Sequence, residues 1–216
     1  MSPSRAVLFD LDGTLADTAP DLAEALNRLR ADQGLAPLAL QIVRPFASAG
    51  ARGLLHVGFG IKPGEGEYAS LREAFLEYYA ERPCDETRLF PGMAELLEEL
   101  GRRSIAWGVV TNKATRFTER ILTTLSLAPA CVVCGDTTPH LKPHPAPMLY
   151  AAEQLALLPK ECLYLGDDLR DIQAALAAGM RAVAVEWGYH HPEQGGPATW
   201  QADAVIAQPG DLLRLL

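Results

Sequence analysis

The chain has 216 residues and a formal net charge of −8 at pH 7. This length allows one sizeable core with an insertion but is short for two independent domains, and the acidic balance argues against a nucleic-acid partner. No apolar stretch approaches the roughly 20 residues that span a bilayer, and the start, Met-Ser-Pro-Ser-Arg, lacks the features of a signal peptide. We therefore expect a cytoplasmic protein with no membrane partner.

The first predicted element is a short buried strand at residues 6–9, the apolar run Ala-Val-Leu-Phe. The apolar spacing of helices follows it and is found in four segments: 21–30, 41–46, 52–56 and 68–79. No strand pattern is present between residue 16 and about residue 88. The sequence therefore predicts a small helical domain at 17–87, inserted into a core domain made of 1–16 and 88–216.

Strands and helices alternate in the second part of the chain. Strands are predicted at 105–111, 131–133, 162–165, 182–185 and 204–206, and helices at 93–101, 115–125, 146–156, 171–178 and 211–216. This alternation is typical of an α/β fold, a Rossmann-like parallel sheet with right-handed crossovers and helices on both faces.

Two aspartates, Asp10 and Asp12, directly follow the first predicted strand in the motif Asp-Leu-Asp-Gly-Thr. Open α/β sheets bind their ligands at the carboxyl ends of the strands. Two carboxylates this close repel each other unless a cation lies between them, and oxygen ligands suit Mg²⁺. A solvated acidic turn is the simpler interpretation of this motif when it is taken alone.

Further polar residues lie at the ends of later strands or in the loops between them. Thr111 and Asn112 end the second strand of the core, where a hydroxyl and backbone N–H groups before a helix can hold an anion. Lys142 precedes a proline in Leu-Lys-Pro-His-Pro, a stiff loop on which its cation could neutralise carboxylates or bind phosphate. Taken singly, these residues are also ordinary in polar loops and on surfaces.

The stretch Gly-Asp-Asp-Leu-Arg-Asp follows another predicted strand and contributes Asp167, Asp168 and Asp171. Asp171 is alternatively the N-cap of the next helix. If neighbouring strands bring Asp10, Asp12 and Asp167 to one point, their charges would be intolerable without a metal ion.

The four cysteines do not indicate a disulfide framework, because they are few and lie in apolar surroundings. Cys131 and Cys134 have the spacing of a metal or redox site, which is one alternative. Residues i and i+3 of a strand point to opposite faces, so we expect both to be buried small hydrophobic residues.

Taken in order, the motifs Asp-x-Asp-Gly-Thr, Thr-Asn, Lys-Pro and Gly-Asp-Asp-x-x-Asp resemble those of the haloacid dehalogenase superfamily, in its phosphatase branch, from residue 5 to about 206. The resemblance implies a Mg²⁺-dependent phosphomonoester hydrolase that acts through an aspartyl-phosphate intermediate. Asp10 would be the nucleophile and Asp12 the general acid and base. Thr111 and the Asn112 N–H would bind the phosphoryl oxygens, and Lys142 would link Asp10 to the phosphoryl group.

The resemblance also implies a metal site. Asp10, the backbone carbonyl of Asp12, and Asp167 would hold Mg²⁺, with Asp168 and Asp171 as candidates for outer or water-mediated ligands. Stabilisation in such a site is positional and electrostatic, as phosphoryl transfer requires.

The insertion at 17–87 resembles the C1-type helical cap of this branch, which closes over the site and contacts the substrate. Residues 48–53, Ser-Ala-Gly-Ala-Arg-Gly, resemble its substrate loop. Arg52 could pair with a carboxylate or phosphate of the substrate. A solvated arginine at the start of a helix is the equal alternative.

Within the branch, residues 107–113, 166–172 and 187–193 resemble phosphoglycolate phosphatases and, more closely, N-acetylmuramic acid 6-phosphate phosphatases, which serve peptidoglycan recycling. We therefore expect a small phosphorylated acid or sugar as the partner, foremost N-acetylmuramic acid 6-phosphate or 2-phosphoglycolate. A monomer and a weak homodimer are both compatible with the sequence.

Several other functions share parts of this pattern. A β-phosphoglucomutase-like phosphotransferase has both aspartates and differs in passing the phosphoryl group to another sugar phosphate. A dehalogenase lacks the second aspartate, and Asp12 argues against it. A phospho-receiver module lacks the helical insertion, and the complete set of motif residues argues against a non-catalytic binding protein.

Overall fold

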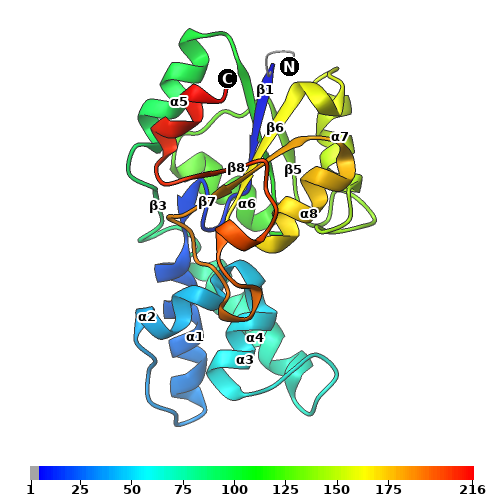
Figure 1. The fold of residues 1–216 in the computed structure, drawn as a ribbon. Helices are drawn as coiled ribbons and strands as arrows, with labels where there is room; N and C mark the ends of the chain where they lie inside the picture. Colours follow the sequence, from blue (N-terminus) through cyan, green and yellow to red (C-terminus); the bar gives the residue numbers. More distant parts are fainter. Residues whose placement is uncertain (1–4) are drawn as a thin grey trace.

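The fold is known from a computed structural model that describes residues 5–216. Six strands form one parallel sheet in the order β5-β4-β1-β6-β7-β8 (Figure 1). The strands are β1 (Ala6–Phe9), β4 (Ala106–Val110), β5 (Cys131–Val133), β6 (Cys162–Gly166), β7 (Arg181–Val185) and β8 (Ala204–Ile206). The predicted α/β fold class with a Rossmann-like parallel sheet is confirmed.

Strand β1 lies between β4 and β6, and this neighbourhood determines where polar side chains can meet. Phe9 at the end of β1 is in register with Val109 of β4 and with Leu165 of β6. Because the three strands are parallel, the residues that follow them leave the sheet at the same edge.

Helices cover both faces of the sheet. One face packs against α7 (Ala146–Gln154) and α8 (Leu169–Ala178), and the other against α5 (Met93–Arg102) and α6 (Thr115–Thr124). Alternate residues of β1 belong to the two hydrophobic clusters, and all four are fully buried. This double burial explains why the strand is an uninterrupted apolar run. We call the sheet with these four helices the core.

A second body, which we call the cap, consists of α1 (Ala19–Asp32), α2 (Leu40–Val43), α3 (Gly50–Phe59) and α4 (Tyr68–Glu81). It lies below the sheet in Figure 1 and has its own hydrophobic cluster. The helix expected at 41–46 is divided, because α2 gives way to a 3-10 helix at Arg44–Ala49. Pro45 lacks the N–H that an α-helix would direct to the carbonyl of Gln41.

The two connections between core and cap pair with each other. Strands β2 (Ala16–Asp17) and β3 (Arg88–Leu89) form a two-stranded antiparallel sheet. No strand was expected at this end of the insertion, because two residues are too few to show an alternating pattern. Beside this pair, the buried carboxylate of Asp21 accepts hydrogen bonds from the backbone N–H of Glu86 at 2.9 Å and of Thr87 at 2.8 Å.

The helix predicted at 211–216 is present as a 3-10 helix, Pro209–Arg214, which begins and ends two residues earlier. Its hydrogen bonds are of the i to i+3 type, as in other short 3-10 segments. All four cysteines are free and buried, and burial raises the pKa of Cys131 and of Cys162 to about 11. Within residues 5–216, no helix combines the length and apolarity that a membrane crossing requires.

Candidate active site

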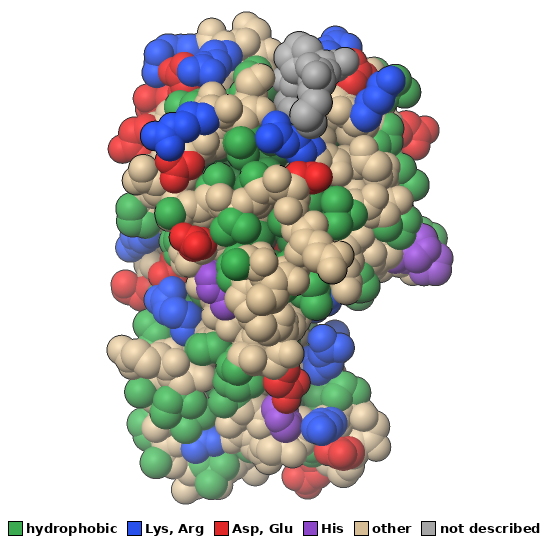
Figure 2. Space-filling view, viewed as in Figure 1, with side chains coloured by type: hydrophobic (Ala, Val, Ile, Leu, Met, Phe, Trp, Pro, Cys, Tyr) green, Lys and Arg blue, Asp and Glu red, His purple; other side chains and the backbone are tan. Residues whose placement is uncertain are grey.

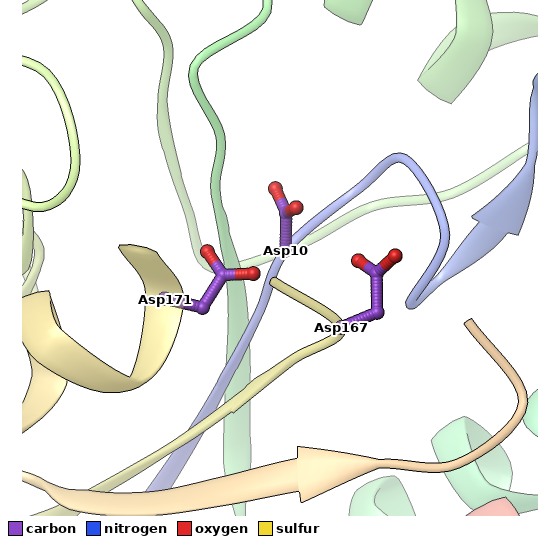
Figure 3. A group of neighbouring side chains, drawn as sticks. All are labelled: Asp10, Asp167 and Asp171. Carbon is purple, nitrogen blue, oxygen red and sulfur yellow. The ribbon is translucent and has the colours of Figure 1, made fainter. Parts of the chain in front are cut away.

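Three buried carboxylates meet at the carboxyl edge of the sheet. Asp10 follows β1, Asp167 follows β6, and Asp171 lies in the first turn of α8 (Figure 3). Each offers an oxygen atom, and these three atoms all lie within 4.8 Å of one another. The backbone N–H of Asp10 donates to the carbonyl of Leu165 at 2.9 Å, which ties the ends of β1 and β6 together.

Asp167 is held by donors from three separate segments. Its Oδ1 accepts from Thr14 Oγ1 at 3.1 Å, and its Oδ2 accepts from Ser48 Oγ at 2.8 Å and from the Tyr189 N–H at 2.9 Å. Gly13 has a φ of 87°, and a Cβ there would lie 2.2 Å from Asp167 Oδ2. The glycine of the first motif is therefore needed for the turn and for the approach of this carboxylate.

Crowding raises the pKa of two members of this cluster. Burial, and then the charges of Asp10 and Asp171, raise the pKa of Asp167 well above its usual range. Burial also raises the pKa of Asp171 to about 7, against the opposing effect of Lys142. Asp10 Oδ1 is buried and accepts no hydrogen bond from any side chain or backbone group in residues 5–216. An all-oxygen set with an unsatisfied buried oxygen fits a hard divalent cation.

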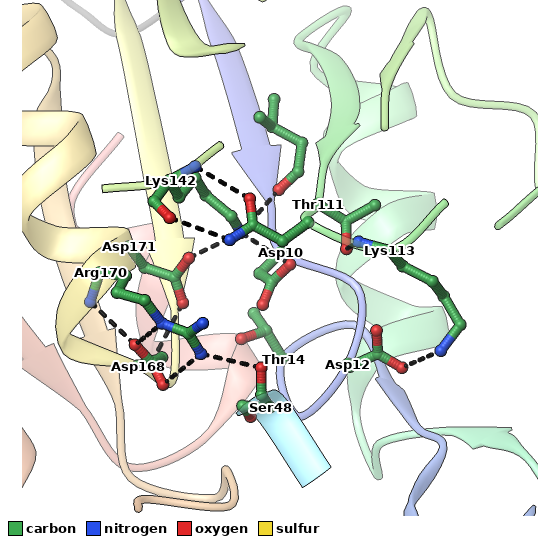
Figure 4. A network of polar contacts seen from close by, with 12 residues as sticks. Asp10, Asp12, Thr14, Ser48, Thr111, Lys113, Lys142, Asp168, Arg170 and Asp171 are labelled. Atoms are coloured by element: carbon green, nitrogen blue, oxygen red, sulfur yellow. Dashed lines mark hydrogen bonds and ion pairs between the residues drawn. The ribbon is translucent and has the colours of Figure 1, made fainter. Parts of the chain in front are cut away.

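Lys142 provides the positive charge inside the core. Its Nζ lies 2.8 Å from Asp10 Oδ1 and 2.7 Å from Asp171 Oδ1 (Figure 4). The contact with Asp10 is ionic and does not have the geometry of a hydrogen bond. Nζ also donates to the Tyr164 hydroxyl at 2.8 Å and to the Val110 carbonyl at 3.0 Å. Burial lowers the pKa of Lys142, but the two carboxylates outweigh it and the net shift is upward.

The predicted phosphate-binding residues, Thr111 and Asn112, line the same cavity as Asp10 and Lys142. The Asn112 side chain donates to the Lys142 carbonyl at 3.0 Å and accepts from the Lys142 N–H at 2.9 Å. Asn112 therefore fixes the loop that carries the lysine. No pattern in the sequence indicates this role, because the two residues are 30 positions apart.

Asp12 turns away from the three-carboxylate cluster. Its Oδ1 lies 2.7 Å from Lys113 Nζ and accepts a short hydrogen bond from Thr18 Oγ1. Lys113 Nζ in turn lies 4.8 Å from the ring centroid of Tyr79 on the cap helix α4. Lys113 was not among the predicted site residues, although it directly follows Thr111 and Asn112. The Asp12 side chain does not belong to the group of three carboxylates that could hold a metal ion, and its predicted contribution remains the backbone carbonyl.

Asp168, and not Asp171, is the N-cap of α8. Its side chain accepts from the Arg170 N–H at 2.9 Å, and Asp171 Oδ2 accepts from the Asp168 N–H at 3.1 Å. The alternative that Asp171 caps the helix is therefore wrong, because the helix begins at Leu169. Arg170 also holds both carboxylate oxygens of Asp168, at 2.7 and 2.8 Å. Burial would raise the pKa of Asp168, but Arg170 lowers it overall.

Ser48 joins the cap to this edge of the core. Besides the bond from its hydroxyl to Asp167, its backbone carbonyl accepts from the Arg170 guanidinium at 2.8 Å. Ser48 begins the stretch that was predicted to contact substrate, but nothing in the sequence indicated its partners. The cap residue therefore touches both a candidate metal ligand and the arginine that follows the helix cap.

A cavity of about 600 Å³ extends from the carboxylate cluster into the cap. Asp10, Asp12 and Lys142 line it from the core, and the predicted cap residue Arg52 lines it from α3. Arg52 is exposed and forms no ion pair within the part of the chain that the structure describes. On the face seen in Figure 2, the surface is indented between core and cap.

Several known proteins are similar to this chain over nearly its whole length. The model of the haloacid dehalogenase-like hydrolase family matches residues 7–185. An N-acetylmuramic acid 6-phosphate phosphatase from Pseudomonas aeruginosa is 42% identical over 214 residues, covering 98% of this chain and 94% of that protein. A phosphoglycolate phosphatase from Xanthomonas campestris pv. campestris is 41% identical over 210 residues, covering 96% and 94%. The crystal structure of a predicted phosphoglycolate phosphatase from Haemophilus somnus superposes with a TM-score of 0.87 at 31% identity, covering 100% of this chain and 99% of that one.

Proposed function

We infer the reaction from the family of this chain, which belongs to the haloacid dehalogenase-like hydrolases and is a phosphatase of that type. We propose that it hydrolyses the phosphomonoester of a small phosphorylated acid or sugar, with Mg²⁺ as cofactor and an aspartyl phosphate as intermediate. The observation that carries this proposal is the buried cluster of Asp10, Asp167 and Asp171, in which Lys142 pairs with Asp10 and Asp171.

Asp10 is the proposed nucleophile. Its carboxylate oxygen forms a bond to phosphorus while the ester P–O bond breaks, and the leaving oxygen takes a proton from Asp12. Water then forms the second bond to phosphorus, the bond to Asp10 breaks, and Asp12 accepts the proton of the water. Lys142, with its Nζ 2.8 Å from Asp10 Oδ1, places a positive charge beside the nucleophile before the attack.

Mg²⁺ would be held by Asp10, the backbone carbonyl of Asp12, and Asp167, and when bound it would supply the positive charge that lets an anionic phosphate approach an anionic nucleophile. Asp171 shares Lys142 with Asp10 and lies close enough to join the same site, directly or through water. Thr111 and the Asn112 N–H are proposed to bind the phosphoryl oxygens, which their position on the cavity wall supports.

The proton transfer requires Asp12 to change its contacts. Its Oδ1 is engaged by Lys113 Nζ, at 2.7 Å, and by the hydroxyl of Thr18. To act first as an acid, Asp12 has to leave Lys113 and carry a proton to the leaving oxygen. We therefore expect Asp12 to take up a different rotamer when substrate fills the cavity.

The proposed substrates are N-acetylmuramic acid 6-phosphate and 2-phosphoglycolate, because the two relatives with these substrates in their names are almost equally similar to the chain. Both compounds carry a carboxylate besides the phosphate. Arg52, which lines the cavity from the cap, is proposed to pair with an anionic group of the substrate.

The test is a phosphate-release assay over these two compounds, N-acetylglucosamine 6-phosphate and common sugar phosphates, with Mg²⁺ or with a chelator. We expect release from at least one substrate, loss of release with the chelator, and recovery when Mg²⁺ is returned. No release from any substrate, with the protein folded and Mg²⁺ present, would refute the proposal. Transfer to a second sugar phosphate without net release would identify a phosphotransferase instead.

The nucleophile is tested by Asp10→Asn, with Asp136→Asn as the matched control. Asp136 follows β5 by three residues, and within residues 5–216 its carboxylate accepts hydrogen bonds only from Thr115. We expect kcat of Asp10→Asn to fall on the order of 10⁴-fold or more, as for other essential nucleophiles, and the control to keep its activity. Retained turnover in folded Asp10→Asn protein would exclude Asp10 as the nucleophile.

A further inference from the structure

The cavity has an excess of positive charge that its own carboxylates do not neutralise. Six cationic residues line it: Arg52, Arg72, Lys113, Arg116, Lys142 and Arg170. Four aspartates line it, and every one of them lies within an ion pair to Lys113, Lys142 or Arg170. The other three arginines form no ion pair with any residue from 5 to 216. In a chain with a net charge of −8, such a group needs an explanation.

Arg72 lies in the N-terminal part of α4, on the face of the helix that lines the cavity. Phe75, Leu76 and Tyr79 follow it at three, four and seven positions, so the four side chains share that face, and all of them line the cavity. A helix rises 1.5 Å per residue, which places Arg72 about 10 Å along the wall from Tyr79. Tyr79 lies at the end of the cavity where the reaction is proposed to occur, which we call the reaction end. Its ring centroid is 4.8 Å from Lys113 Nζ, and Lys113 pairs with Asp12.

Arg116 approaches the cavity from the core. It lies in the first turn of α6 with its guanidinium 4.5 Å from the ring centroid of Phe117. The Phe117 and Tyr79 rings are 5.0 Å apart, so this turn packs against α4. The two exposed arginines therefore line one cavity from opposite bodies, Arg72 from the cap and Arg116 from the core.

We propose that Arg72 and Arg116 bind the carboxylate of a phosphorylated sugar acid, which makes them specificity-determining residues. This proposal rests on the proposed function and deepens it by naming the substrate class. The wall between Arg72 and the reaction end consists of Phe75, Leu76 and Tyr79, which suits the apolar face of a sugar ring.

The length of the wall discriminates between the two candidate substrates. In 2-phosphoglycolate a single methylene separates the carboxylate from the phosphate ester oxygen, so the carboxylate of a molecule bound at Asp10 stays near the phosphate, at the Tyr79 end of the wall. In N-acetylmuramic acid 6-phosphate the lactyl carboxylate and the phosphate are attached to different carbons of the sugar. A cavity of about 600 Å³ is also of the size that takes a sugar phosphate and leaves a two-carbon acid largely uncontacted.

The experiment compares two sugar phosphates that differ only in the lactyl group, N-acetylmuramic acid 6-phosphate and N-acetylglucosamine 6-phosphate. The measured quantity is the ratio of their kcat/KM values in wild type, Arg72→Ala, Arg116→Ala and the control Arg120→Ala. Arg120 is exposed on the same helix as Arg116 but does not line the cavity. Arg72→Lys tests whether charge alone restores part of the ratio.

We expect the wild-type ratio to favour the carboxylated sugar, and each alanine variant to lower that ratio about 10- to 100-fold, mainly through KM. Arg120→Ala should keep the wild-type ratio. A ratio unchanged in both Arg72→Ala and Arg116→Ala would overturn the proposal, and so would equal losses on both substrates, which would indicate electrostatic steering of any phosphate. Absence of phosphate release in the wild type is a different result and refutes the proposed function itself.

Discussion

The core side and the cap side of the cavity treat charge in opposite ways. On the core side, Asp12, Asp168 and the pair of Asp10 and Asp171 each have a buried or half-buried cation as partner. On the cap side, Arg52 and Arg72 have no carboxylate partner within residues 5–216, and Arg116 at the start of α6 is the one core cation on the cavity wall, among these residues, that shares this property. The carboxylates on the core side are therefore all paired with cations of the core, and this part of the site can serve any phosphate ester. The cap leaves positive charge for a substrate to neutralise.

This difference predicts that substitutions in the paired groups of the core reduce turnover of every substrate alike, whereas substitutions of the unpaired arginines change the preference between substrates. The largest effect should come from Lys142→Gln, which removes the cation shared by Asp10 and Asp171. We expect kcat to fall about 10³-fold or more on all substrates, and the metal-free protein to lose about 3–5 kcal/mol of stability, as when other buried pairs are broken.

Phosphate release and chemical unfolding of Lys142→Gln measure both effects. Lys160→Gln is the matched control, because Lys160 is exposed on a 3-10 helix away from the cavity. A loss confined to one substrate would contradict the comparison, since it would give a cation of the paired carboxylate cluster a role in specificity.

The carboxylate cluster also makes the stability of the core depend on pH and metal. The pKa of Asp171 is about 7 in the folded protein against 3.8 when unperturbed, and the pKa of Asp167 is raised as well. The folded state therefore holds protons that the unfolded state has lost, so the free energy of unfolding of metal-free protein falls as pH rises from about 4 to about 7.

Thermal unfolding at pH 5 and pH 8, with and without Mg²⁺, checks this sign. We expect the metal-free protein to melt roughly 5 °C or more lower at pH 8, and Mg²⁺ to raise Tm more at pH 8 than at pH 5. In Asp10→Asn protein, which has one carboxylate fewer, the pH effect should be smaller. A metal-free protein that is more stable at pH 8 than at pH 5 would contradict the raised pKa values of Asp167 and Asp171.

The core end of this site was predictable because parallel strands impose a simple rule. Asp10, Thr111 and Asp167 follow β1, β4 and β6, which are buried strands that apolar runs reveal, and such strands end at one edge. Lys142 is carried there by a loop, and only its resemblance to a known motif indicated its place.

The remaining site residues could not be predicted because their partners come from distant segments. Ser48 meets Asp167 across 119 positions, and Arg170 meets Ser48 across 122. Such contacts depend on how the cap sits against the core, and no periodicity in the sequence encodes that placement. The β2–β3 pair was not predicted for another reason: strands of two residues are too short to show an alternating pattern of apolar and polar residues.

The junction offers a way to disturb the cap while leaving the reaction chemistry in place. Asp21→Ala removes the acceptor of two backbone N–H groups, those of Glu86 and Thr87. Leaving buried donors unpaired should cost about 1–3 kcal/mol, which corresponds to a Tm lower by about 2–10 °C. Asp85→Ala, at an exposed position nearby, is the control. Unchanged stability of Asp21→Ala would show that the junction does not depend on these bonds.

The smallest predicted effect concerns the contact between cap and metal site. Ser48→Ala removes one of three donors to Asp167 and leaves those of Thr14 and Tyr189. We expect the Mg²⁺ concentration for half-maximal activity to rise about 2- to 5-fold, since one hydrogen bond to a charged group is lost among several. Ser70→Ala, on the exposed side of α4, should leave it unchanged. A Mg²⁺ requirement equal to that of wild type would show that the contact between Ser48 and Asp167 does not affect metal binding.

The pairing of β2 with β3 has a consequence for how this molecule can be rebuilt. Ala16 lies opposite Leu89, so the chain leaves the core and returns to it at positions one strand spacing apart, about 4.8 Å. A segment of any length that starts and ends at neighbouring points leaves the rest of the scaffold undistorted. The helices between them form an exchangeable module, and grafting another cap onto Asp17 and Arg88 should redirect substrate choice while the sheet remains unaltered.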